Sequence, residues 1–189
     1  MSKIFIDITM SLDGFIAGPD ISSENPMGKG GLRLHNWMFG AQTEADKKLS
    51  GEQMQNTGAV IIGRRMYETA ISGPWGNENP FAAPVFVLTE AAPEQKVAGF
   101  TYVTDGIQGA LSQAKKVAGD KNIWITGANV SQQYLKAGYV DELHIHIAPV
   151  LFMAGTKLFE NLGDQHVELE VQNCIQTPGA THIVYKVIR

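Results

Sequence analysis

Two arginines follow a glycine where a strand-like pattern gives way to a helix-like one. Residues 60–68 read VIIGRRMYE, an apolar run followed by Gly63, Arg64 and Arg65. A glycine lets a ligand approach the backbone, and the first turn of a helix presents unpaired N–H groups to an anion. Because a guanidinium binds phosphate through two hydrogen bonds, the segment suits a phosphate-bearing ligand. Taken alone, such a turn is more often a helix start with two solvated arginines.

A second junction of the same kind lies at residues 126–129, which read TGAN between another apolar run and another helix-like pattern. It could seat a pyrophosphate or simply cap a helix. The chain has neither a G-x-G-x-x-G fingerprint nor a Walker-type lysine, so ordinary Rossmann and P-loop motifs are absent. Two phosphate-suited junctions on one sheet nevertheless favour a nucleotide as the ligand.

Carboxylates are the candidates for proton transfer. Asp46 ends the sequence TEAD at residues 43–46, a variant of the capping box, and capping a helix is its favoured interpretation. Asp13, in the segment SLDG, suits an Asp-Gly turn, a substrate contact or both. Asp7 lies within the first strand pattern, where we expect it to be exposed or to face a sheet edge.

His144 and His146 form an H-x-H pair on one face of a predicted strand, a spacing that could bind a metal. Zinc sites take three or four protein ligands, and no third ligand is evident. A polar sheet face is therefore the favoured interpretation, and no metal is expected.

Short apolar segments predict the strands that must position these residues. They are residues 4–9, 59–62, 85–88 and 123–125, then DELHIHIAPVL after residue 140, and a hairpin of VELEVQNCIQ and THIVYKVI around Pro178-Gly179. Strands alternating with helices predict a three-layer α/β/α sandwich with a mostly parallel sheet and an antiparallel C-terminal hairpin. We expect one domain over residues 1–189, with ligands beyond the carboxyl ends of the strands.

Two helices are predicted between these strands. Asn129 is expected to be the N-cap of the second, which ends at Gly138. The first ends at Gly119, and its apolar face consists of Ile107, Ala110, Leu111, Ala114 and Val117.

Composition restricts the class of protein. A chain of 189 residues with a formal charge of −4 is not a general binder of nucleic acid or anionic membranes. With Cys174 as its single cysteine, it forms no intrachain disulfide and lacks the P-C-x-x-C zinc signature of nucleotide deaminases. The first residues, MSKIFIDITM, enter a strand pattern directly, so we expect a cytoplasmic protein.

The chain resembles the dihydrofolate-reductase-like superfamily, and more closely the stand-alone homologues of the reductase domain of the bifunctional riboflavin-biosynthesis deaminase-reductase. The resemblance covers nearly the whole chain. It rests on ITMSLDGFIAG, LHNWMF, VIIGRRMYE, VFVLT, IWITGAN and YVDELHIHIAPVLFMAGTKLFE.

The resemblance implies an NADPH site at the carboxyl edge of the sheet and, as in many relatives, a homodimer. Ile16 would pack on the nicotinamide, and Leu88 and Thr89 would flank the adenosine. The phosphates would lie against Gly63, Arg64, Arg65 and Met66, and against the turn of Thr126, Gly127, Ala128, Asn129 and Val130.

Two departures from the family pattern bear on the cofactor. Thr126 stands where the family commonly has a glycine, and a β-branched residue restricts the backbone there. Glu90 follows Thr89 near the expected 2′-phosphate, which its carboxylate would repel. NADH is therefore not excluded as the cofactor.

The resemblance also implies which residues surround the substrate. Classical dihydrofolate reductases carry an acid on the helix before the G-R strand, where Asp46 lies. We expect Thr9, Asp13, Trp37 and Phe152 around a small heteroaromatic (pyrimidine- or pterin-like) or carbonyl-type substrate, with core packing as an equal role for Phe152. The long loop 18–36 would be a substrate lid or an intermolecular contact. The alternatives are an NADP(H)-binding protein without catalysis and a purely structural domain.

Overall fold

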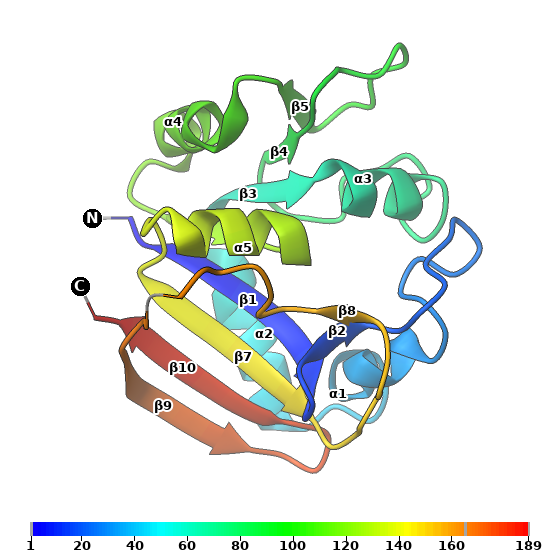
Figure 1. The fold of residues 1–189 in the computed structure, drawn as a ribbon, viewed down its shortest axis with the longest axis vertical. Coiled ribbons are helices and arrows are strands. Elements are labelled where there is room, and N and C mark those ends of the chain that lie inside the picture. The colour runs from blue at the N-terminus through cyan, green and yellow to red at the C-terminus, as the bar shows by residue number, and fades with distance from the viewer. Residues whose placement is uncertain (1, 165, 189) are drawn as a thin grey trace.

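The computed structural model describes residues 2–164 and 166–188 and has an eight-stranded sheet in the order β5-β4-β3-β6-β1-β7-β10-β9 (Figure 1). The first six strands in this order are parallel, and β10 and β9 are antiparallel to their neighbours. The strands are β1 (Ile4–Ser11), β3 (Thr57–Gly63), β4 (Val85–Leu88), β5 (Phe100–Val103), β6 (Asn122–Ile125), β7 (Glu142–Ala148), β9 (Leu169–Gln176) and β10 (Thr181–Val187). The predicted fold class is confirmed.

Helices cover both faces of the sheet. In Figure 1, α5 (Ala128–Lys136) lies in front of the sheet and α2 (Glu44–Asn56) behind it. Side chains of α5 and α4 (Gly106–Ala118) pack on Ile4, Ile6 and Ile8 of β1. On the opposite face, α3 (Arg64–Ile71) packs on β3 and β4.

Shorter elements close the end of the sheet where β1 finishes. They are β2 (Phe15–Ala17), which pairs with β8 (Thr156–Lys157), and the helical turns η1 (Gly31–His35) and α1 (Asn36–Phe39). The loop 18–36 is folded on itself, since Gly18 donates to Met27 over 2.9 Å and Lys29 donates to Pro19 over 2.7 Å. Its role as a lid stays a prediction.

Two details of the predicted helices were wrong. Val117 is 51% exposed, and Ala118 is buried in its place at the end of α4. The N-cap of α5 is Gly127, with a φ of 95°, so Asn129 lies within the first turn. Among the described residues, no helix combines the length and apolar character needed to cross a membrane.

Candidate active site and cofactor edge

Two helix N-termini lie side by side at the carboxyl edge of the sheet. The neighbouring parallel strands β3 and β6 lead into α3 and α5, whose N-caps are Gly63 and Gly127. Neither helix has a side-chain N-cap hydrogen bond. The first-turn N–H groups are therefore not occupied by a capping side chain, as an anion-binding terminus requires.

The two termini are in close contact, and each depends on a glycine. A Cβ on Gly63 would lie 2.9 Å from Val130 Cγ2 of α5. A Cβ on Gly127 would lie 3.6 Å from Met66 Sδ of α3, and the φ of +95° at Gly127 disfavours any other residue. The donors of the two junctions thus converge at one place, and this donor set fits a pyrophosphate.

The two predicted phosphate-binding arginines are exposed on the first turn of α3. Arg64 Nε donates to Glu68 Oε1 over 2.6 Å, and this contact, followed by the more distant Glu90, raises the pKa of Arg64. Arg65 makes no ion pair with another residue in the described part of the chain. An incoming phosphate would therefore meet Arg65 directly and would compete with Glu68 for Arg64.

The remaining predicted cofactor residues line the same edge. Leu88 is paired in register with Gly63, and Thr89 donates from its N–H to Val103 over 3.0 Å. Thr126 is buried, and its N–H donates to the carbonyl of Ile61, so its backbone is fixed at the turn. Of the others, Ile16 and Ala128 are half-buried, Val130 is buried, and Asn129 is exposed.

The predicted substrate residues Thr9 and Trp37 are brought together but are buried. Trp37 Nε1 donates to Thr9 Oγ1 over 3.0 Å, and the two residues are 1% and 6% exposed. The indole ring packs against two histidines, His146 and His182, with ring centroids 4.7 and 4.8 Å away. In this conformation, neither side chain presents a free surface to a ligand.

Asp13 joins two loops. Its carboxylate accepts hydrogen bonds from Ser11 Oγ over 2.6 Å and from the N–H groups of Phe152 and Met153 over 3.0 and 2.8 Å. The bond from Ser11, supported by the two N–H groups, lowers the pKa of Asp13 to about 2. An ionised carboxylate with three donors suits a structural junction and is poorly suited to giving a proton. Phe152 itself is half-buried beside this junction.

Asp46 forms the predicted capping box and also reaches the sheet. Its Oδ2 accepts from Thr43 N over 2.8 Å, and its own N–H donates to Thr43 Oγ1 over 3.2 Å. Its Oδ1 lies 3.0 Å from His182 Nε2. Burial by itself would raise the pKa of Asp46, but the bonds from Thr43, Thr177 and His182 outweigh it, so the pKa is lowered.

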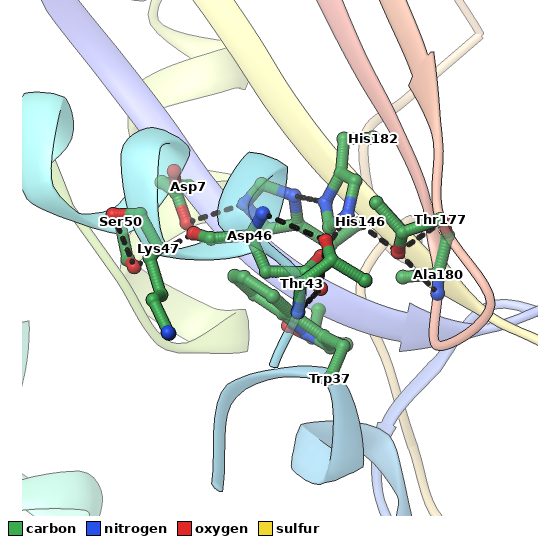
Figure 2. A network of polar contacts seen from close by, with 11 residues as sticks. Asp7, Trp37, Thr43, Asp46, Lys47, Ser50, His146, Thr177, Ala180 and His182 are labelled. Atoms are coloured by element: carbon green, nitrogen blue, oxygen red, sulfur yellow. Dashed lines mark hydrogen bonds and ion pairs between the residues drawn. The ribbon is translucent and has the colours of Figure 1, made fainter. Parts of the chain in front are cut away.

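Beyond Asp46, the structure brings together groups that the sequence did not connect (Figure 2). His182 on β10 lies opposite His146 on β7, and their Nδ1 atoms are 2.7 Å apart. His146 Nε2 lies 3.2 Å from Asp7 Oδ1. The expectation of an exposed Asp7 was wrong: Asp7 is 6% exposed because β1 is a central strand whose face lies beneath α2. Only the register of β7 and β10 could have predicted the histidine pair.

The H-x-H pair therefore divides between two environments. His146 is buried in this chain of contacts, whereas His144 is partly exposed and lies 3.1 Å from Glu142 Oε2. Within the described ranges 2–164 and 166–188, no group of three or more metal-ligating side chains is arranged to hold a metal ion.

A cavity of about 190 Å³ lies between α2 and the sheet, next to the histidine pair. Buried in this region, Gln53 Nε2 has no hydrogen-bond partner among the described residues. The polar residues that line the cavity include Asp7, Glu52, Gln53, His144, His146 and His182.

The strand order and the glycine-capped edge define an α/β protein with a mostly parallel sheet. Residues 2–183 match the RibD C-terminal domain family, and the chain belongs to that family. The YwjB protein of Bacillus subtilis (strain 168) is 27% identical over 192 residues, which cover 97% of each chain.

Two solved structures share the fold over nearly the full length of both chains. A Shewanella sp. PV-4 protein provisionally assigned to riboflavin biosynthesis is 22% identical, with a TM-score of 0.78 over 100% of both chains. The dihydrofolate reductase of Enterococcus faecalis, solved with NADP(H), is 15% identical over 99% of this chain and 97% of its own, with a TM-score of 0.60.

Proposed function

We propose that this protein is an NADPH-dependent reductase of a small heteroaromatic (pyrimidine- or pterin-like) or carbonyl-type substrate. The observation that carries the proposal is the pair of glycine-capped helix N-termini at Gly63 and Gly127, with two exposed arginines beside them. Membership of a reductase-domain family and the likeness to an NADP(H)-bound dihydrofolate reductase support it. When bound, NADPH supplies the hydride, and the protein supplies orientation and a proton.

Each part of the edge has a distinct task in this proposal. The N–H groups of the first turns of α3 and α5 bind the pyrophosphate, and Arg64 and Arg65 bind the 2′-phosphate. Leu88 and Thr89 flank the adenosine, and Ile16 packs on the nicotinamide. Glu90 weakens the preference for the 2′-phosphate because it lies in the field of Arg64.

A titration of NADPH and NADH into the purified protein, followed by reduced-nicotinamide fluorescence, tests the proposal. We expect micromolar binding of NADPH, weakened about tenfold or more by Arg64→Ala, since a charge-assisted hydrogen bond contributes about 1.5–3 kcal/mol. Lys115→Ala, at an exposed lysine of α4, is the matched control and should bind like the wild type. If the protein binds neither NADPH nor NADH, the proposal is wrong.

A catalytically inactive NADP(H)-binding protein is the second candidate. The burial of Thr9 and Trp37 and the engagement of Asp13 favour it, because these predicted substrate groups are already paired. Nucleotide binding without oxidation of NADPH across a panel of pterins, aminopyrimidines and carbonyl compounds would select this alternative.

We also propose that the protein forms a homodimer through β9. This edge strand is exposed over nearly its whole length, and Leu169 and Val171 are 41% and 59% exposed. An apolar edge strand with unpaired backbone groups is a template for pairing with a second copy.

A further inference from the structure

Four titratable side chains form one buried chain of contacts across the layer between α2 and the sheet (Figure 2). The chain runs from Asp7 through His146 and His182 to Asp46, with separations of 3.2, 2.7 and 3.0 Å. None of the four residues is more than 6% exposed. Each contact is short enough for a hydrogen bond, so each requires one proton between its two atoms.

Counting these protons fixes the charge. Three contacts need three protons, whereas two neutral imidazoles and two carboxylates supply only two. With two protons, either the Nδ1 lone pairs would face each other at 2.7 Å or a ring nitrogen would face a carboxylate without a hydrogen. The arrangement therefore holds one extra proton and has a total charge of −1.

The surroundings indicate where this proton lies. Burial, and then electrostatic repulsion from His146, lower the pKa of His182, whereas Asp46 and Asp7 act in the opposite direction. Burial, and then the same neighbour, also lower the pKa of His35 on η1. Trp37 lies against both rings, and an indole stabilises a cation near its face. The extra proton is therefore held by the pair of His146 and His182, between Asp7 and Asp46.

Other charged groups around the array largely compensate one another. On β7, Glu142 contacts His144 and also Lys3, the residue before β1, and these contacts lower the pKa of Glu142 to about 2. His144 Nδ1 lies 3.7 Å from Asp7 Oδ2, and Glu52 of α2 lines the cavity. Asp7 and Asp46 therefore remain the charges in direct contact with the two imidazoles.

We propose that Asp7, His146, His182 and Asp46 form one acid–base array that stores a proton and delivers it through Asp7 to a ligand in the cavity beneath α2. Asp7 lines that cavity, whereas both oxygens of Asp46 are engaged by Thr43 and His182. This inference rests on the proposed reductase function, because a reduced substrate must also gain a proton.

The step is a single proton transfer followed by release. The N–H bond at His146 Nε2 breaks as an O–H bond forms at Asp7 Oδ1, which leaves both imidazoles neutral and Asp46 ionised. The Asp7 carboxyl then gives its proton to a basic atom of the ligand in the cavity. The array falls from a charge of −1 to −2 and is restored by one proton from solvent.

The pH dependence of unfolding, measured with urea on the protein without cofactor or substrate, tests the stored proton. Above the ordinary histidine pKa of about 6.5, the unfolded chain binds two protons on these four groups and the array binds three. The folding equilibrium constant should therefore fall tenfold per pH unit between pH 7 and 9, as long as the array keeps its proton. Below about pH 6, the unfolded chain binds four protons, so stability should fall again as pH decreases.

Asp7→Asn is the decisive variant because it preserves shape and removes the need for the third proton. The asparagine amide can donate to His146 Nε2, so two protons then satisfy every contact. We expect its stability to be independent of pH between 7 and 9, whereas His144→Gln should keep the slope of the wild type. A wild-type protein whose stability is flat over this range overturns the proposal.

A second measurement uses the wild type alone. Nitrogen-15 NMR of the histidine side chains at pH 8 should show three protonated ring nitrogens shared by His146 and His182. Neutral rings at both positions overturn the array. If the protein binds nucleotide but its stability does not change with pH between 7 and 9, the array alone is overturned. If its stability falls with pH as expected but no nucleotide binds, the reductase function is overturned, together with the use of the stored proton in it.

Discussion

Gly63→Ala tests the close contact between the two helix N-termini on which the proposed cofactor site depends. The new Cβ would lie 2.9 Å from Val130 Cγ2. That distance is about 0.6 Å inside an ordinary carbon–carbon contact of about 3.5 Å. Val130 is 2% exposed and cannot move into solvent, so α3 and α5 must separate. Overpacking of this kind costs about 1–3 kcal/mol of unfolding free energy.

The companion variant Val130→Ala distinguishes this clash from a general effect of the extra methyl group. Alone, it removes two buried methyls and should cost about 2 kcal/mol. In Gly63→Ala/Val130→Ala, the new Cβ occupies space that the valine has left. We therefore expect the double variant to be more stable than the sum of the single effects by about 1–2 kcal/mol.

Urea unfolding of the four proteins gives the coupling energy, and NADPH fluorescence gives the effect on the site. Gly63→Ala should weaken NADPH binding, whereas Val130→Ala should leave it close to wild type because the valine is buried behind the turn. Unfolding free energies that add to within about 0.5 kcal/mol would refute the contact between the two N-termini.

Two further predictions concern the surface. Glu90→Gln removes a carboxylate that would repel the 2′-phosphate, and it should raise the preference for NADPH over NADH about two- to fivefold at low salt. The size follows from the free energy of an exposed charge pair, which is at most about 1 kcal/mol. An unchanged ratio of the two dissociation constants would contradict this prediction. Val171→Lys on β9 should convert the proposed homodimer to a monomer in sedimentation experiments, whereas Val117→Lys on α4, a similarly exposed valine, should not. Dimers in both variants would exclude the β9 edge.

The parallel part of the fold could be predicted because its strands carry their own signal. A run such as residues 59–62 is buried on both faces and reads as uninterrupted apolar sequence. The glycines at 63 and 127 mark the turns into helices in the same local way. The start of α5 was predicted wrongly: Gly127, with a φ of 95°, is the N-cap, and Asn129 lies inside the helix.

The acid–base array could not be predicted because it is assembled across strands. His146 and His182 meet only through the register of β7 and β10, and Asp46 arrives from a helix 136 residues earlier than His182. The prediction that Asp7 is exposed was wrong for a related reason. A polar residue that alternates with isoleucines normally faces solvent, but β1 lies in the middle of the sheet with helices on both sides.

The character of α2 argues that the array serves chemistry more than stability. Its sequence, EADKKLSGEQMQN, has no continuous apolar stripe, and Asp46 is its one buried residue. Most helices in globular proteins are held by an apolar face, and a buried ionic network is a weak substitute that apolar residues often replace with a gain in stability. A layer of carboxylates and imidazoles beside a polar cavity therefore stabilises the fold less than an apolar layer would. Such a loss of stability is expected where charged groups must be kept close to a reacting ligand. Its most direct test is whether the stability of Asp7→Asn becomes independent of pH between 7 and 9.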